Sequence, residues 1–261
     1  MRKFSNAIAA VAAASLTLAA ANAATYQWSF DPNVGSVNHA GGTILSVTTT
    51  YNDATDELSW YATFGAVPGQ PLLRTDGFTL AISPGPNPKN HPGEMALFYF
   101  DAVGPTPIMS VYGYNAMNNQ TSFNDGSNAG GTQAPDRIFT SQDDPTNVIS
   151  DIRAIDNGDG TRTLGFTMDA TNIIDHLPLH PDAQDPWTGA SYGDHIGIWF
   201  HQQAGTTRSY NSNGYLTSWG SRKQGWLDRN METTVLVPEP ASIGLMVGGL
   251  IVGAIRRRNA R

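Results

Sequence analysis

The sequence predicts an all-β protein whose main body is an antiparallel β-sandwich of jelly-roll or concanavalin-like type. Hydrophobic residues alternate with polar ones at a period of two nearly everywhere that a period can be read. Turn formers are frequent, with 27 glycines and 16 prolines in 261 residues. Of the 21 acidic residues between positions 24 and 237, 18 are aspartate, which favours turns over helical surfaces. An eight- to ten-stranded barrel is the alternative.

The first two predicted strands form a hairpin. Leu45, Val47 and Tyr51 alternate with polar residues, and after the polar turn 52–56 the alternation resumes over 58–64. Further strands are expected at 78–82, 95–100 and 108–114. The middle one of these three is apolar on both faces, as expected of a central strand buried between two layers.

A second hairpin is expected in the C-terminal half, where Val148–Ile155 pairs with Thr163–Met168 across the turn Asn157–Gly160. Residues 115–135 form a long polar stretch without a period. No change in composition marks a domain boundary, so residues 24–237 are expected to form one domain. The remaining strands are expected at 194–201, 215–219 and 233–237, with a helical turn within 171–176.

Residues 1–23 have the three-part pattern of a secretory signal peptide. Arg2 and Lys3 form the basic start, residues 7–20 form the apolar middle, and Ala21-Asn22-Ala23 forms a small-residue cleavage site. We therefore expect cleavage before Ala24 and export of the remaining chain.

The C-terminal segment, residues 238–261, predicts attachment to a membrane. It contains Pro238-Glu239-Pro240, the uncharged run Ala241–Ile255 and the cluster Arg256-Arg257-Arg258. As a helix the run spans about 22 Å, against a hydrocarbon core of roughly 30 Å, and snorkelling arginines reduce the mismatch. The arginines favour a cytoplasmic end for a transmembrane helix. The alternative is a terminal helix of a soluble domain.

This order of motif, apolar helix and arginine cluster resembles the PEP-CTERM sorting signal of Gram-negative bacteria. The resemblance implies export, an inner-membrane-anchored precursor and later residence at the cell surface or in the extracellular matrix. It also implies recognition by an exosortase-type transpeptidase at Pro238, Glu239 and Pro240, with Arg256, Arg257 and Arg258 as the basic end of the signal. Exopolysaccharide and biofilm association are common among such proteins. Residues 75–78 and 197–201 resemble uncharacterised β-rich exported proteins that carry this tail.

The charge of residues 24–237 excludes one class of partner. This part of the chain has 9 basic and 21 acidic residues, a net charge of −12. A surface this acidic repels nucleic acid and anionic lipid. The chain has no cysteine, so it offers neither disulfides nor thiolate ligands.

Two motifs resemble metal-binding sites but lack the ligands or the geometry that a metal needs. Asp156–Thr161 resembles the start of a calcium loop, but Gly158 stands at position 3, where an EF-hand needs an oxygen ligand, and Thr167 stands at position 12, where it needs a bidentate Glu. A hairpin turn is therefore expected. His176 and His180 are four residues apart, but nearby prolines prevent the helix that would align them. We expect no metal and no cofactor.

The string Gly189–Gly193 fits the G-x-S-x-G pattern of serine hydrolases. That motif requires a strand–turn–helix elbow, whereas Ser191 lies in a loop that leads into a strand. A glycosidase would need two facing carboxylates, and no acidic pair is spaced two apart on a predicted strand. We therefore expect no catalytic residue and no enzyme.

The strand 194–201 offers the candidate binding site. If Ile198 faces the core, then His195, Trp199 and His201 face the opposite surface, where sugars can stack on an indole. The two histidines are about 20 Å apart at strand rise, too far to share an ion. The alternative is that Trp199 packs beneath residues 115–135.

The expected function is that of an exported, non-catalytic protein of the envelope or extracellular matrix. A carbohydrate-binding module with Trp199 on its ligand face is the alternative, to which Trp187, Trp219 and Tyr215 could contribute. A surface hydrolase whose site is not visible in the sequence is the third hypothesis.

Overall fold

The computed structural model describes residues 25–29, 31, 36–83, 95–114, 136–144, 147–174, 195–232 and 234–236. These residues form an all-β structure with one short helix, α1 (Thr171–Ile174). The strands are β1 (Thr25–Ser29), β2 (Ser36–Asn38), β3 (Ile44–Asn52), β4 (Glu57–Phe64), β5 (Thr75–Ser83), β6 (Met95–Asp101), β7 (Ile108–Tyr114), β8 (Asp136–Thr140), β9 (Ile149–Asp156), β10 (Arg162–Asp169), β11 (His195–Tyr210), β12 (Leu216–Gln224), β13 (Trp226–Glu232) and β14 (Thr234–Leu236).

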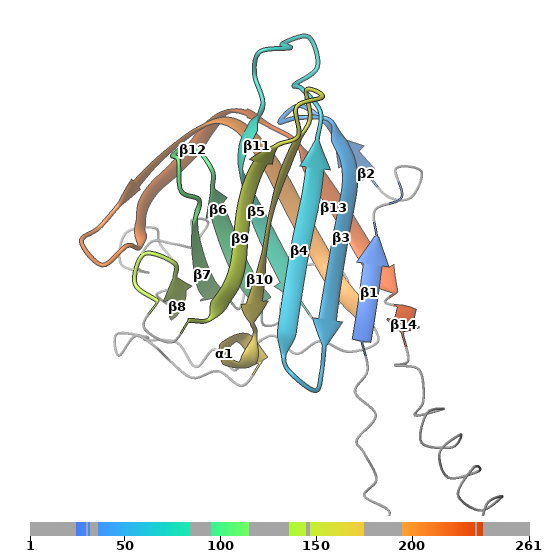
Figure 1. Cartoon of the computed structure of the whole chain (residues 1–261), viewed down its shortest axis with the longest axis vertical. Coiled ribbons are helices and arrows are strands. Elements are labelled where there is room, and N and C mark those ends of the chain that lie inside the picture. The colour runs from blue at the N-terminus through green and yellow to red at the C-terminus, as the bar shows by residue number, and fades with distance from the viewer. Residues whose placement is uncertain are drawn as a thin grey trace, which may run out of the picture. The chain divides into compact units, whose positions relative to one another are not determined.

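The strands form two sheets, which lie in separate layers (Figure 1). Sheet A has the order β14-β1-β3-β4-β10-β9. Sheet B has the order β2-β13-β11-β5-β6-β7-β8, and β12 pairs with β11 outside this order. All strand pairs among the described residues are antiparallel. The predicted all-β, antiparallel class is confirmed, and the two layers fit a β-sandwich.

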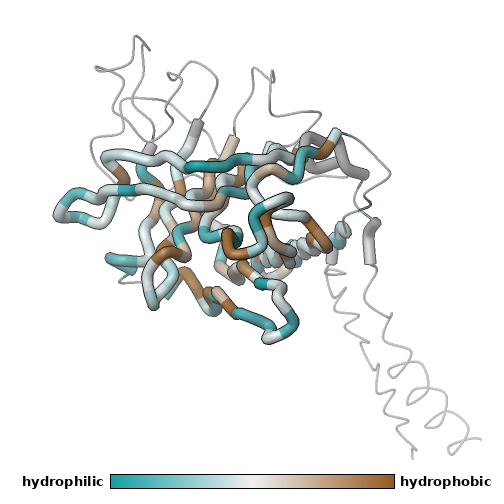
Figure 2. Tube along the Cα trace, turned by 90° about the horizontal axis from the view of Figure 1, so that it is seen from above, coloured by the Kyte–Doolittle hydropathy of each residue, from teal (hydrophilic) through white to brown (hydrophobic). Residues whose placement is uncertain are grey.

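Aromatic residues from both sheets fill the core between the layers. Trp60 of sheet A packs on Phe200 of sheet B with ring centroids 5.3 Å apart, and Phe98 stacks on Phe166 at the same distance. All four side chains are fully buried. Full burial of one such side chain contributes about 1.5–3 kcal/mol. Hydrophobic and hydrophilic residues are interspersed along the tube (Figure 2). Buried positions alternate with more exposed ones in β4, which is the pattern that predicted the class.

Both predicted hairpins, β3–β4 and β9–β10, are confirmed, but one position in the first is wrong. Leu45 is 49% exposed and does not belong to the core. A β-bulge between Ile44 and Ser46 shifts the alternation by one residue, so Ile44 is the buried residue of the pair.

The strand predicted over 194–201 is much longer in the structure, because β11 continues to Tyr210. Its first half pairs with β5 and β13, and its second half pairs with β12. The sequence does not reveal the extension, since Gln202–Thr207 is largely polar and has no alternation. Strands β1, β2, β8 and β13 were not predicted either; three of them are five residues or shorter and β13 lacks alternation.

Residues 205–224 form a hairpin arm, which bends from sheet B at Gly205. Gly205 has a φ of 66°, a left-handed conformation that favours glycine. The Asp76 carboxylate of β5 accepts hydrogen bonds from the backbone N–H of Gly205 (3.0 Å) and from both the N–H (3.0 Å) and the hydroxyl (2.6 Å) of Thr206. One carboxylate therefore satisfies three donors at the bend.

Several predictions from the sequence lie outside the described residues. These are the signal peptide (1–23), the sorting segment (238–261), the Ser191 loop and the histidine pair at 176 and 180. In the part of the chain that the structure describes, no helix has the length and apolarity needed to span a bilayer.

We predict that Asp76→Ala destabilises residues 24–237 by about 2–4 kcal/mol, because it leaves partly buried donors unsatisfied at the bend. Urea unfolding followed by tryptophan fluorescence measures the change. Glu57→Ala, at an exposed position of sheet A, is the control and should cost less than about 0.5 kcal/mol. Equal losses in the two variants would contradict the role given to Asp76.

Candidate functional site

The outer face of sheet B carries the candidate binding residues. Ile198 and Phe200 are fully buried in the core, so Trp199 and His201 lie on the opposite, outer face. Their rings meet edge to face, with centroids 4.7 Å apart, and both side chains are half-buried. The backbone of His195 lies in β11, but its side chain is outside the described residues. The structure thus brings Trp199 and His201 together.

Gln224, the last residue of β12, orients His201. The side-chain amide nitrogen of Gln224 lies 2.7 Å from Nδ1 of His201. Because an amide nitrogen only donates, Nδ1 accepts and the ring proton lies on Nε2. The Oε1 atom of Gln224 accepts a hydrogen bond from Gln203 at 3.2 Å. This chain of hydrogen bonds fixes the histidine ring beside Trp199.

The arm packs on the same outer face through a second, smaller hydrophobic cluster. Tyr99, Tyr112, Tyr215 and Leu216 are buried there, and Trp219 packs at its margin. Trp219 meets Tyr99 edge to face at 5.4 Å. The backbone N–H of Leu216 donates to the Tyr112 hydroxyl at 2.9 Å. The arm is therefore docked by side-chain packing and by a buried hydrogen bond.

A buried ion pair also holds the arm. Asp101 is 1% exposed and accepts hydrogen bonds from the Arg208 guanidinium, from the Tyr210 hydroxyl (3.0 Å) and from the backbone N–H of Val103 (2.9 Å). Burial first, and then the Asp101 charge, raise the pKa of Tyr210, so its hydroxyl remains a donor. The hydrogen bond to Asp101 raises the pKa of Arg208. The carboxylate is thus fully compensated despite its burial.

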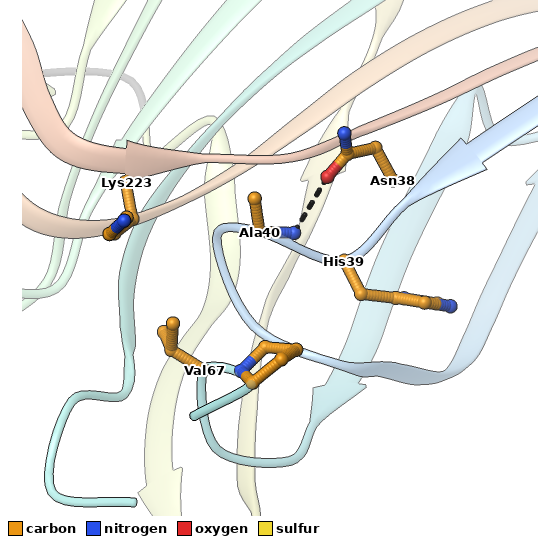
Figure 3. Close-up of a pocket in the computed structure, with 6 residues that line it drawn as sticks. Asn38, His39, Ala40, Val67 and Lys223 are labelled. Atoms are coloured by element: carbon orange, nitrogen blue, oxygen red, sulfur yellow. Dashed lines mark hydrogen bonds between the residues drawn. The ribbon is translucent and has the colours of Figure 1, made fainter. Parts of the chain in front are cut away.

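A cavity of about 330 Å³ lies at the edge of sheet B (Figure 3). Two of its polar side chains serve the local turn: Asn38 Oδ1 accepts from the Ala40 N–H at 2.8 Å, and His39 Nδ1 accepts from the Ile44 N–H at 3.1 Å. The cavity joins three separate chain segments, so no local motif predicts it. It is lined by Asn38, His39, Ala40, Val67, Pro68 and Lys223.

The outer face of sheet A carries a polar cluster around Tyr61. The Tyr61 hydroxyl lies 2.6 Å from Asp151 and 2.7 Å from Thr167, and Arg153 lies over the ring at 5.6 Å. Arg153 also pairs with Asp151. The hydroxyl, the carboxylate and the guanidinium satisfy one another, so this cluster stabilises the sheet and does not present a set of groups to a ligand.

The loop Asp156–Thr161, whose sequence resembles the start of a calcium loop, is a tight turn. Gly158 and Gly160 have φ values of 81° and 90°. Asp159 accepts hydrogen bonds from the Thr161 N–H (2.9 Å) and hydroxyl (2.6 Å), and these bonds lower the pKa of its carboxyl group. Across the described ranges, no three acidic, histidine or cysteine side chains are grouped as a metal site would need.

No family model, no curated protein and no solved structure matches this chain. Its function must be inferred from its own residues. Among the described residues, the outer face of sheet B has the set best suited to a ligand, since Trp199 and His201 are partly exposed and held in fixed orientations.

We predict that Arg208→Leu destabilises the domain by about 3–5 kcal/mol, since it leaves the buried Asp101 carboxylate without its cation. Combining it with Asp101→Asn should cost much less than the sum of the two single changes. Urea unfolding gives the stability, and hydrogen exchange of the β12 amides reports on docking of the arm. Arg222→Leu, at an exposed position of the same arm, is the matched control. Additive losses would show that the pair is not coupled.

Proposed function

We propose that this chain is an exported, non-catalytic protein of the cell envelope or extracellular matrix, sorted by a PEP-CTERM/exosortase system. The signal-peptide pattern of residues 1–23 and the sorting pattern of residues 238–261 support export and membrane attachment. The body between them is a β-sandwich of jelly-roll or concanavalin-like type. Its net charge of −12 favours solubility outside the cell and opposes binding to nucleic acid.

The observation that carries the proposal is the position of the two ends of the domain. β1 and β14 pair at the edge of sheet A, with Thr25 opposite Leu236. Thr25 follows the proposed signal-peptide cleavage site by one residue, and Leu236 precedes Pro238 by two. The pairing of β1 with β14 supports the proposal, because cuts before Thr25 and after Leu236 would leave the core between the sheets unchanged.

In this proposal the precursor is anchored in the inner membrane of a Gram-negative bacterium by the C-terminal helix. An exosortase-type transpeptidase then acts at Pro238, Glu239 and Pro240. The mature protein resides at the cell surface or in the matrix, where exopolysaccharide is the expected neighbour.

We predict that replacing Pro238–Pro240 by alanines leaves the tail uncut, and that deleting Arg256–Arg258 releases the precursor from the membrane fraction. Cell fractionation and intact-mass measurement of the C-terminus check both results. Replacing Ser242 by alanine, within the apolar run, serves as the control and should not change sorting. Wild-type behaviour of both test variants would refute the sorting assignment.

Carbohydrate binding is the second candidate function, and the arrangement of Trp199 and His201 favours it. An indole held beside an imidazole supplies a stacking surface next to a polar ring. His195 lies on the same strand and completes the set predicted from the sequence.

We predict that Trp199→Ala abolishes glycan-array binding by the exported domain, because the stacking surface is lost. Leu72→Ala, a fully exposed loop residue, is the control and should bind as the wild type does. Unchanged binding by Trp199→Ala would exclude Trp199 from the ligand surface.

A further inference from the structure

Trp226 extends the candidate surface beyond the residues that the sequence indicates. It is 39% exposed, at the start of β13. In the ladder of β11 with β13, Phe200 lies opposite Leu227. The ladder of β11 with β12 keeps the same register, with Gln203 opposite Gln224. In this register Trp226 lies opposite His201. Because Leu227 is buried in the core, the adjacent Trp226 belongs to the outer face of sheet B.

These residues form a row across sheet B, which we call the aromatic row. His201 lies opposite Thr79, and Thr79 lies opposite Tyr99. Tyr99 in turn contacts Trp219 of the arm. With neighbouring strands about 4.8 Å apart, the row extends about 14 Å from β13 to β6. The aromatic row consists of Trp226, His201, Thr79, Tyr99 and Trp219, with Trp199 packed beside His201.

The exposed atoms of the aromatic row suit the two kinds of surface on a sugar. The indole nitrogen of Trp219 is buried although the side chain is half-buried overall, so the carbon framework of the ring is the exposed part. Such carbon surfaces pack against sugar C–H faces. Between the tryptophans lie the partly exposed side chains of His201 and Thr79, which add a polar ring and a hydroxyl to the surface.

The charge of the surface indicates which sugars would bind. The aromatic row contains no lysine, arginine or carboxylate of its own, and the nearby Asp101 is neutralised by Arg208. Asp228 lies opposite Trp199 in the ladder of β11 with β13 and adds a negative charge at the margin of the row. The exported domain as a whole carries −12. A polymer of uronic acids would be repelled, whereas a neutral chain would meet no electrostatic penalty.

We propose that the aromatic row binds a neutral oligosaccharide chain that lies across β13, β11 and β5 and reaches Trp219 of the arm, which packs on the buried Tyr99 of β6. The length of the row exceeds what one sugar ring would cover, and its two ends are tryptophans. The inference rests on the carbohydrate-binding candidate and adds Trp226, Trp219 and the neutral class of ligand to it.

Affinity electrophoresis of the mature exported protein tests the proposal, with hydroxyethylcellulose, galactomannan or polygalacturonate in the gel. We expect retardation by at least one of the two neutral polymers and none by polygalacturonate. Trp226→Ala and Trp219→Ala should each weaken retardation about tenfold. Trp226→Tyr should retain most of it, which separates loss of stacking from loss of fold. Ile155→Ala, which removes an exposed apolar side chain from sheet A, should migrate as the wild type does.

Each alternative outcome has a distinct meaning. Retardation that is lost in Trp199→Ala but kept in Trp226→Ala and Trp219→Ala would overturn the aromatic row and leave the carbohydrate-binding candidate standing. Retardation by polygalacturonate alone would overturn the neutral class. A protein that reaches the matrix but is retarded by no polymer would overturn both carbohydrate proposals and leave the export proposal intact.

Discussion

Two carboxylates on sheet B, Asp76 and Asp101, determine where the arm lies. Asp76 binds the backbone of the bend, and Asp101 binds Arg208 and Tyr210 farther along the arm. A single carboxylate would fix one point of a long hairpin and leave its direction open. Two carboxylates on neighbouring strands fix both its origin and its direction. The small hydrophobic cluster can then form, since it requires the arm to lie over β6 and β7.

The bend explains why an acidic protein buries a charged pair on a sheet face. Polar residues around Gly205 give β11 and β12 no apolar stripe with which to follow the main core. Packing alone would leave this stretch free to continue straight out of the sheet. Charge-assisted hydrogen bonds are directional, so they specify one orientation where burial of apolar area cannot. A buried pair of this kind adds little net stability, but it disfavours other positions of the arm.

The sequence predicts the parts of the fold that depend on neighbouring residues, and it misses those that depend on register. Alternation alone is enough to assign Trp60 and Phe200 to the core and Trp199 to the opposite face. The prediction that Leu45 faces the core is wrong because a β-bulge, for which the sequence has no signal, places Ile44 there instead. The sequence does not predict the arm for a similar reason, since the residues that hold it on β5 and β6 are more than a hundred residues away in the chain.

The same distinction applies to the candidate site. Trp199 and His201 are two residues apart, so strand geometry predicts that they share a face. Trp226 is 25 residues from His201 in the chain, and only the ladder between β11 and β13 places the two side by side.

The position of the aromatic row also separates the two proposed interactions, processing of the tail and binding of a polysaccharide. Both ends of the domain lie on β1 and β14 of sheet A, whereas the aromatic row lies on the outer face of sheet B. A transpeptidase acting at the chain end and a polysaccharide bound to the sheet would therefore not compete for the same residues.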